Sequence, residues 1–393
     1  MRILLVHNFY KSSAPSGEDI VFRQERDLLQ SSGFEVVTYE RHSDEIDEGS
    51  LSVLTGTAVS AAWSRQTYRD IGKLIDETAP DVAHFHNTFP LISPSAYAAC
   101  KERRVPVVQT LHNYRLICPG ALLLREGQPC EKCVGATLLP ALRYRCYRNS
   151  LAATASVVGM LARNRLAGTY RSSVDRYIAL TQFAAERMIA GGLPRERIRV
   201  KPNFLPDPPA PRRKAAEPYA VYVGRLREEK GVATLLRAWR RLPGVPLHVL
   251  GDGEQRQELQ CYAVEHALNV EFLGMCNRQK VLEMVGGAAV QVIPSEWYEG
   301  FPLVILEAYA CGTAVVASDI GSLRELIVPG TTGYLFEPGN PDDLADKVVH
   351  IMSADRARQI GQGAHSTFSN KYTADANLAR IKQIYAECRA SLQ

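Results

Sequence analysis

Two glutamates, Glu299 and Glu307, flank a segment whose residues are suited to binding a phosphate group. Between them, Gly300 and Pro302 indicate a tight turn, and a helical pattern begins at Leu303. A helix N-terminus carries unpaired N–H groups and a partial positive charge, so it attracts anions. We therefore predict a phosphate site at the start of this helix. Glu299 then lies just before the site, and Glu307 is placed to accept hydrogen bonds from ribose or sugar hydroxyls. The alternative is an ordinary helix with solvated acidic side chains.

A basic loop is the second feature whose residues could do chemistry. It follows an apolar strand pattern, and Gly224 at the strand end allows close backbone approach. Arg225 and Lys230 emerge from the same loop. Arginine suits bidentate phosphate recognition and lysine supplies a point charge, so together they could neutralise a diphosphate without a metal ion. The alternative is a solvated basic loop.

The elements that must position these residues follow an alternation of strand and helix patterns. Such alternation predicts parallel sheets with helices on both faces, and ligands of these sheets bind beyond the carboxyl ends of the strands. Strand patterns cover 2–7, 35–39, 82–86, 105–111, 177–180, 198–200, 219–223, 247–250, 270–273, 290–293 and 314–317. Helical patterns cover 20–31, 95–103, 183–190, 232–241, 254–266, 279–285, 303–310, 344–352 and 374–391.

A proline-rich stretch interrupts this alternation, so we predict two Rossmann-like α/β domains that face each other across a cleft. The predicted parts are an N-terminal domain over 1–203 with a cysteine-rich insertion at 118–146, a linker over 204–218, a C-terminal domain over 219–373, and a helix over 374–393 that packs back on the N-terminal domain.

Composition is typical of a globular protein. Of the 393 residues, 46% are hydrophobic and 22% are charged, and the net charge of +4 does not by itself indicate a nucleic-acid partner. The sequence has no apolar run long enough to span a membrane, and its N-terminus is too short and too soon polar for a signal peptide. Nine cysteines, an odd number, fit poorly with a disulfide framework. We therefore expect a cytoplasmic protein, where thiols stay reduced.

The order of motifs in the second half resembles that of the family-4 glycosyltransferases, which are retaining nucleotide-sugar enzymes with the GT-B fold. The resemblance covers the whole second domain and continues more loosely into the first. The motifs that carry it are Gly224-Arg225 with Lys230-Gly231, Gly251-Asp252-Gly253, Pro294-Ser295, Glu299-Gly300-Phe301-Pro302 with Glu307-Ala308, Gly312 to Ser318, Gly321 with Glu325, and Gly333 to Phe336.

The resemblance implies that the second domain binds a nucleotide-diphosphate sugar, the donor. Arg225 and Lys230 match the pair that binds the diphosphate and stabilises it as a leaving group. Glu307 matches the acid that holds the ribose hydroxyls, and Glu299 the acid beside the donor sugar. Further implied donor contacts come from Gly300, Phe301, Pro302 and Leu303 for the sugar and phosphate, and from 273–277 for the nucleobase.

In the first domain the resemblance implies two contacts. Gly17, in the segment Ser16 to Asp19, matches a loop that faces the diphosphate and acceptor, although one glycine stands where many relatives have two. His112 follows a strand pattern and matches the active-site histidine, which would bind the donor sugar or orient the acceptor. A lone histidine at a strand end is also a common structural feature. His84 and His86 point at the cleft or the core, and both readings stay open.

The implied reaction transfers a sugar with retention of anomeric configuration, by front-face attack in which the leaving phosphate takes the acceptor proton. No Asp-x-Asp motif stands at a strand end, so we expect no catalytic metal. The implied acceptor is a glycan or lipid-linked glycan in the synthesis of a cell-surface polysaccharide or glycoconjugate. Alternatives are a nucleotide-sugar epimerase, another enzyme of this fold, or a non-catalytic nucleotide-sugar-binding protein.

Four cysteines, Cys118, Cys130, Cys133 and Cys146, lie close together in the sequence. A C-x2-C pair with two further thiolates is suitable spacing for tetrahedral zinc, so we predict a structural zinc site. All four positions would be occupied by sulfur, which excludes a catalytic role. The alternative is a set of buried or merely reduced thiols.

The stretch between Glu131 and Asp175 has no acidic residue. Over 138–171 it interleaves arginines with apolar side chains, a combination that suits an anionic membrane surface. The alternative is a helix pair that buries its apolar face and leaves the arginines in water. No nucleic-acid motif accompanies the charges, so we expect no nucleic-acid partner. The basic residues are Lys132, Arg143, Arg145, Arg148, Arg163, Arg165 and Arg171.

Overall fold

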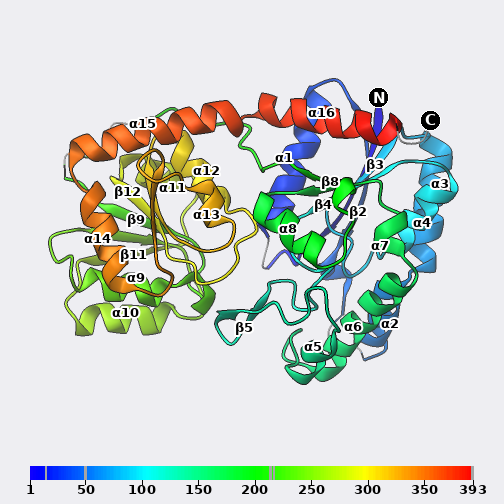
Figure 1. Ribbon diagram of the computed structural model, residues 1–393, viewed down its shortest axis with the longest axis horizontal. Coiled ribbons are helices and arrows are strands. Elements are labelled where there is room, and N and C mark those ends of the chain that lie inside the picture. Colours follow the sequence, from blue (N-terminus) through cyan, green and yellow to red (C-terminus); the bar gives the residue numbers. More distant parts are fainter. Residues whose placement is uncertain (14–15, 48–50, 212–214, 216, 391–393) are drawn as a thin grey trace. The chain divides into compact units, whose positions relative to one another are not determined.

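Each half of the chain forms a parallel sheet, as the alternating patterns predict (Figure 1). Both sheets have six strands, and the last strand of the second sheet, β14 (Gly333–Phe336), was not among the predicted ones. The computed structural model describes residues 1–13, 16–47, 51–211, 215 and 217–390. Their contacts divide the chain into two units. The first contains Met1–Leu123, Glu131–Asn203 and Asn377–Gln393, and the second contains Leu124–Cys130 and Phe204–Ala376. The expected insertion at 118–146 is thus divided, because the hairpin of β5 (Leu124–Arg125) and β6 (Gln128–Pro129) groups with the second unit.

The sheet of the first unit has the strand order β2-β1-β3-β4-β7-β8, and every neighbouring pair is parallel. Both faces of β1 are buried, which explains its continuous apolar sequence. The strands are β1 (Arg2–Phe9), β2 (Glu35–His42), β3 (Val82–Phe85), β4 (Val107–Leu111), β7 (Arg176–Ala179) and β8 (Ile198–Val200).

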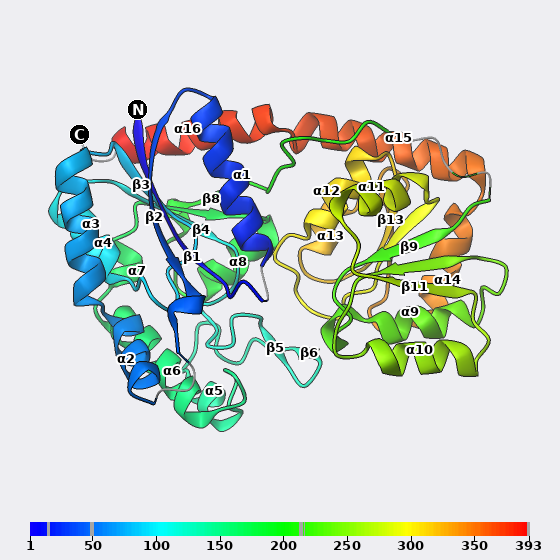
Figure 2. The same cartoon turned by 180° about the vertical axis from the view of Figure 1, so that it is seen from behind.

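Helix α1 (Gly17–Ser31) and helix α16 (Ala374–Ala390) share a core with β1 in the first unit, and the two helices lie near each other in both views (Figures 1 and 2). Phe22 of α1 and Ile381 and Tyr385 of α16 belong to this core. The predicted end of the last helix at Ser391 lies outside the described residues. The other helices are α2 (Leu51–Ala62), α3 (Arg65–Thr78), α4 (Ser95–Glu102), α5 (Leu139–Arg143), α6 (Leu151–Leu166), α7 (Thr169–Ser172) and α8 (Gln182–Ala190).

The sheet of the second unit has the strand order β11-β10-β9-β12-β13-β14, also with parallel pairs throughout. Its strands are β9 (Ala220–Val223), β10 (Leu247–Leu250), β11 (Val270–Gly274), β12 (Val290–Ile293), β13 (Ala314–Ser318) and β14 (Gly333–Phe336). Its helices are α9 (Val232–Trp239), α10 (Arg256–Glu265), α11 (Arg278–Gly287), α12 (Leu303–Ala310), α13 (Leu323–Leu326), α14 (Pro341–Ile351) and α15 (Ala354–Lys371).

In the second sheet, the direction in which successive strands are added reverses between β9 and β12. Strands β9, β10 and β11 are added toward one edge, and β12, β13 and β14 toward the other. The register pairs β9 with β12 at only two positions, Ala220 with Val290 and Val221 with Gln291, so the ladder stops before the carboxyl ends of these strands. In open α/β sheets, this switch point is where ligands bind. The switch point therefore indicates the loops after β9 and β12 as the candidate ligand site.

Candidate active site

An ion pair joins the two loops at the switch point of the second sheet. Lys230 ends the short 3-10 helix that follows β9, and Glu299 lies in the loop that follows β12. Lys230 Nζ donates to Glu299 Oε1 over 2.7 Å, and Ser295 Oγ donates to the same oxygen over 2.7 Å. The structure thus brings together two of the residues that the sequence predicts for donor binding.

Burial sets the electrostatics of this pair. The Glu299 side chain is 8% exposed and that of Lys230 is 17% exposed. Burial alone would raise the pKa of Glu299, but the Lys230 ammonium and the hydrogen bonds from Lys230 and Ser295 outweigh it, so this pKa is lowered. The Lys230 ammonium also lies 5.2 Å from the centre of the Trp297 ring, within cation–π range. Lys230 is therefore a cation whose position is fixed on two sides.

Glycines let the three loops around this pair pack closely. Gly231 has φ +66°, and a Cβ there would meet the carbonyl oxygen of Pro294 at 1.9 Å. Gly251, after β10, has φ +136°, and a Cβ there would meet the carbonyl oxygen of Gly224 at 1.9 Å. Any larger residue would push the loops apart, so these glycines fix the backbone on which Arg225 and Lys230 stand.

Arg225 and Arg227 lie in the same loop but differ in their contacts. The backbone carbonyl of Arg225 accepts a hydrogen bond from Tyr222 Oη over 2.8 Å. Its guanidinium is exposed and makes no hydrogen bond to any described residue. Arg227, in contrast, donates to Glu254 over 2.7 Å. Arg225 is thus a free cation in the same loop as the fixed ammonium of Lys230, as a ligand for phosphate oxygens requires.

Helix α12 begins at Leu303, as predicted. Pro302 is its N-cap residue and, among the described residues, no side chain caps the first turn. Gly300 and the buried Phe301 form the turn that leads into it. Uncapped N–H groups at a helix N-terminus have no acceptor within the helix, so this end of α12 can bind an anion.

Glu307 lies further along α12 and is not paired with Glu299 or Lys230. Its carboxylate makes no hydrogen bond or ion pair with a described residue, and burial raises its pKa while the more distant Arg278 opposes the shift. A half-buried carboxylate without donors favours a ligand that supplies hydroxyl donors. The predicted nucleobase segment 273–277 follows at the end of β11, where the Asn277 side chain caps α11.

In the first unit, Gly17 starts α1 and His112 follows β4. A Cβ on Gly17 would meet no atom within 4 Å, so the fold itself does not require glycine there. His112 Nε2 pairs with His86 Nδ1 over 2.9 Å, and burial lowers the pKa of His112 well below its ordinary value. The question left open for His84 and His86 is settled in part, because both side chains are buried in the first unit.

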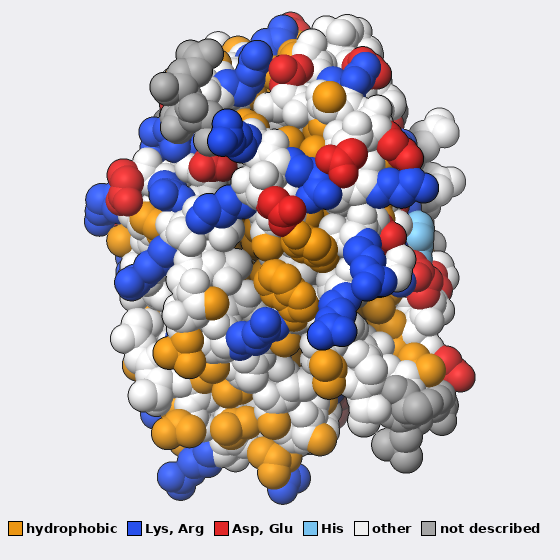
Figure 3. Space-filling model, turned by 90° about the vertical axis from the view of Figure 1, so that its right-hand side faces the viewer, with side chains coloured by type: hydrophobic (Ala, Val, Ile, Leu, Met, Phe, Trp, Pro, Cys, Tyr) orange, Lys and Arg blue, Asp and Glu red, His pale blue; other side chains and the backbone are white. Residues whose placement is uncertain are grey.

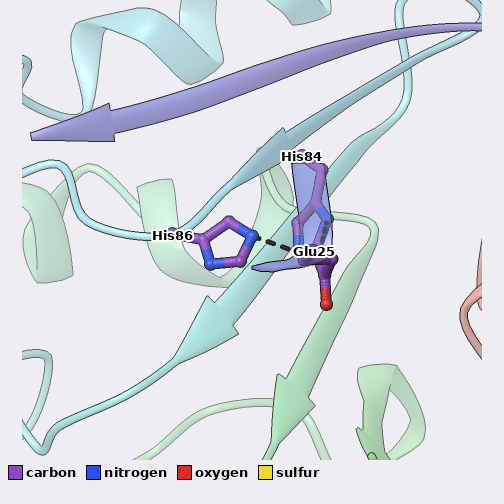
Figure 4. Close-up of side chains that lie close together, drawn as sticks. All are labelled: Glu25, His84 and His86. Carbon is purple, nitrogen blue, oxygen red and sulfur yellow. Dashed lines mark hydrogen bonds and ion pairs between the residues drawn. The ribbon is translucent and has the colours of Figure 1, made fainter. Parts of the chain in front are cut away.

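The four cysteines predicted to hold zinc are reduced, with Cys118 and Cys133 buried and Cys130 and Cys146 half-buried. Cys118 and Cys146 both lie beside Gly120, since a Cβ there would be 3.8 Å from Cys118 Sγ and 3.8 Å from Cys146 Cβ. Within the described part of the chain, the group with three ligand atoms inside 4.8 Å of one another is a different one, Glu25, His84 and His86 (Figure 4). The zinc site remains a prediction.

The segment 138–171 has both buried and exposed apolar side chains. Helix α6 packs on α2 and buries Val157, Met160 and Leu161. Leu139, Leu151 and Leu166 are nevertheless exposed by 67%, 53% and 90%. Figure 3 shows a face of the molecule whose lower part gathers hydrophobic and basic side chains with few acidic ones. No described helix is both long and apolar enough to cross a bilayer. The exposed arginines are Arg143, Arg145, Arg148, Arg163 and Arg171.

Sequence reasoning missed the residues that support the predicted ones. Ser295 and Trp297 surround Lys230 and Glu299, and the position of Ser295 just after an apolar strand was the available signal. Glu25 and Lys201 form a buried ion pair beside His86. Glu25 had a signal too, since it falls on the apolar stripe of α1 between Phe22 and Leu29.

Two family models match this chain. The model described as Glycosyltransferase Family 4 matches residues 21–207, and the one described as Glycosyl transferases group 1 matches residues 206–366. With these two matches and two parallel α/β sheets, the chain belongs to the family-4 glycosyltransferases of the GT-B fold.

Relatives and solved structures agree with this family. The phosphatidyl-myo-inositol mannosyltransferase of Mycolicibacterium smegmatis is 25% identical over 396 residues, 96% of this chain and 91% of that protein. Sucrose-phosphate synthase from Thermosynechococcus elongatus has a TM-score of 0.72 at 19% identity and covers 99% of both chains. Anabaena HepE in complex with UDP has a TM-score of 0.66 at 20% identity and covers 98% of this chain and 100% of that chain. The chain spans less than half the length of other curated relatives that it matches, 48%, 43% and 35% of three of them.

Proposed function

We propose that this protein transfers a sugar from a nucleotide-diphosphate sugar to a glycan or lipid-linked glycan, with retention of anomeric configuration. The observation that carries the proposal is the arrangement at the switch point of the second sheet. The fixed ammonium of Lys230 and the free guanidinium of Arg225 lie in the loop after β9. The neighbouring strand, β12, is followed by the loop that leads to the uncapped start of α12. These are donors suited to the two phosphate groups of a nucleoside diphosphate.

The chemistry follows from where charge develops. When the bond between sugar C1 and the phosphate oxygen breaks, the sugar becomes oxocarbenium-like and the diphosphate gains negative charge. Lys230 and Arg225 stabilise that charge, which lowers the barrier. The acceptor hydroxyl attacks C1 from the face of the leaving group and passes its proton to the departing phosphate oxygen. Because two side-chain cations serve the diphosphate, no divalent metal is needed for this step in the proposed mechanism.

The remaining residues of the site bind the donor. Glu307 accepts hydrogen bonds from the ribose hydroxyls, and Glu299 holds Lys230 while it lies beside the donor sugar. A structural neighbour was solved with UDP, which supports UDP-sugars as the first donors to test. The acceptor would belong to a cell-surface polysaccharide or glycoconjugate.

Arg225→Ala tests the proposal most cleanly, because this side chain makes no hydrogen bond to the described protein and its loss leaves nothing unpaired. Release of nucleoside diphosphate from a donor panel, with and without acceptor glycans, would be measured. We expect the turnover of Arg225→Ala to fall by about 10²–10³, the usual cost of removing one group that stabilises transition-state charge. Arg227→Ala is the matched control, since Arg227 in the same loop is engaged by Glu254.

Equal rates for the two variants would contradict the diphosphate role. Nucleotide-sugar binding without release of nucleoside diphosphate under any acceptor would favour a binding protein, and a changed sugar on the intact nucleotide would favour an epimerase.

Association with an anionic membrane is a second proposed property, supported by the exposed leucines beside exposed arginines of α5 and α6. Basic residues next to apolar ones bind anionic lipid headgroups while the apolar side chains enter the interface. In this proposal the enzyme works at the cytoplasmic face of the cell membrane. A lipid-linked acceptor would then be presented at the surface where the enzyme is bound.

A further inference from the structure

A chain of buried polar groups in the first unit leads to His112. Lys201 Nζ donates to Glu25 Oε2 over 2.8 Å, His86 Nε2 lies 3.1 Å from Glu25 Oε1, and His86 Nδ1 lies 2.9 Å from His112 Nε2. Figure 4 shows Glu25 between His84 and His86. Lys201 and Glu25 are each 1% exposed and His86 is 3% exposed, so these groups need hydrogen-bond partners within the protein.

The ligand atoms of Glu25, His84 and His86 are close enough for a metal ion, but their partners argue against one. The second oxygen of Glu25 is held by the Lys201 ammonium, which would repel a cation. His84 uses both of its nitrogens, with Tyr385 Oη and Thr110 Oγ1 each at 2.8 Å. The cluster is therefore better explained as a hydrogen-bonded network than as a metal centre.

The direction of each hydrogen bond can be assigned from Glu25. Burial would raise the pKa of Glu25, but the Lys201 ammonium and the hydrogen bond from His86 outweigh it, so this carboxyl is ionised. An ionised carboxylate only accepts hydrogen bonds, so His86 Nε2 carries a proton and donates to it.

The charge of the network decides the next bond. Lys201 and Glu25 already balance each other, and a proton on His86 Nδ1 would add an unpaired buried charge. His86 is therefore neutral, with a lone pair on Nδ1. His112 Nε2 must then carry the proton in the bond between them, because one of the two nitrogens has to donate. A neutral His112 with its proton on Nε2 has a lone pair on Nδ1, and that atom has no hydrogen-bond partner among the described residues.

We propose that Glu25 and His86 are positioning residues that hold His112 in its Nε2–H tautomer, so that Nδ1 is a fixed acceptor for a substrate hydroxyl. The nature of the hydroxyl, on the donor sugar or on the acceptor, rests on the proposed function, whereas the tautomer does not. A fixed acceptor recognises an O–H group and cannot serve an oxygen of the diphosphate, which has no proton to give.

The test is nitrogen NMR of the full chain with histidine rings labelled with ¹⁵N, which distinguishes protonated from unprotonated ring nitrogens. The His112 signals are assigned by their loss in His112→Gln. In the wild type we expect protonated Nε2 and unprotonated Nδ1. A proton on Nδ1, or a charged His112 ring, at neutral pH would overturn the proposal, whatever the activity.

Two matched variants separate positioning from general damage to the core. His86→Phe keeps a ring but removes both contacts, and it should give a mixture of His112 tautomers. His84→Phe also removes a neighbour of Glu25 but none of His112, and it should keep the wild-type pattern. Melting temperatures establish that both are folded. If both variants shift the tautomer equally, the positioning role of His86 is wrong.

A kinetic arm uses a conservative replacement. His86→Asn restores an acceptor oxygen near the place of Nδ1. We expect His86→Phe to lower kcat at least tenfold and His86→Asn to recover most of that loss, with less than threefold change in donor KM. Full activity of His86→Phe in the presence of a mixed tautomer would refute the role in catalysis. A wild type that transfers no sugar at all would instead contradict the proposed function and leave the NMR result to decide the tautomer.

Discussion

Glu18 is a carboxyl whose protonation should be visible in the stability of the protein. It lies in the first turn of α1, where Asn113 Nδ2 donates to its Oε1 over 2.7 Å, and its Oε2 is buried with no hydrogen-bond partner in the described residues. Burial raises the pKa of Glu18 from an ordinary 4.5 to about 7. The folded state therefore binds a proton that the unfolded state has already lost at intermediate pH.

The sign of the pH dependence follows directly. The contribution of Glu18 to stability is fully present below pH 4.5 and is lost as the pH rises to about 7, because the charged form is the one that burial disfavours. At about 1.4 kcal/mol per pKa unit, the upper limit is about 3 kcal/mol. We expect the melting temperature of wild type to fall relative to Glu18→Gln between pH 5 and pH 8. Calorimetry measures this, with Asp27→Asn, an exposed position on the same helix, as control. Parallel melting curves for Glu18→Gln and wild type would refute the buried state of Glu18.

The residues of the donor site could be foreseen to different degrees. Arg225 and Lys230 were predicted because a strand pattern ends just before their loop, and Glu299 because a helical pattern begins just after it. The ion pair between Lys230 and Glu299 was not predicted, because local spacing does not reveal which of several charges in two loops will form contacts. The bond between Glu25 and Lys201 joins positions 176 residues apart, and only the assembled sheet brings them together.

At the scale of elements, several bounds were predicted and several helices were missed. Strands β10 and β12 and helix α12 have the predicted bounds. Helix α15 was not predicted, because its sequence includes Gly361, Gly363 and several polar residues of low helix propensity. Tertiary packing overrides this, since a Cβ on Gly361 would lie 2.1 Å from the carbonyl oxygen of Gly312. The glycines that weaken α15 as an isolated helix therefore let it approach the backbone of Gly312 and Thr331 closely.

The cysteine-bearing segment between β4 and α6 can be tested as an element. If zinc ties its loops together, purified reduced protein should contain about one zinc per chain, and Cys133→Ser should lose the metal and melt at lower temperature. Cys261→Ser is the control, because Cys261 is exposed and lies outside the segment. Protein that is folded, reduced and free of zinc would show that the thiols are simply buried. Metal content by atomic emission and thermal melting are the measurements.

At the scale of the whole molecule, the basic and apolar surface of α5 and α6 predicts binding to anionic vesicles. Each arginine near an anionic surface contributes about 1 kcal/mol, so Arg143→Ala with Arg145→Ala should weaken binding on the order of tenfold to thirtyfold. Arg237→Ala with Arg240→Ala removes the same charge from exposed positions of the second unit and serves as control. Flotation with vesicles rich in phosphatidylserine measures the effect. Equal loss in both double variants, or no binding by wild type, would contradict a specific membrane surface.

The two sheets were predictable because each repeats one pattern of buried strand and covering helix, which is a local property of the sequence. The division of the chain into two units was harder to predict. The hairpin of β5 and β6 departs from the first unit, and the segment after Ala376 returns to it. Both follow from contacts between positions distant in the sequence.

Tyr385 of α16 completes the hydrogen bonds of His84, and Ile381 and Ile384 fill the core beneath β1. The first unit is thus closed by residues that the ribosome makes after the entire second unit. During synthesis, one apolar face of the first sheet stays uncovered, and the second unit can fold before the first is complete. Residues of α16 cover that face once this helix has been synthesised.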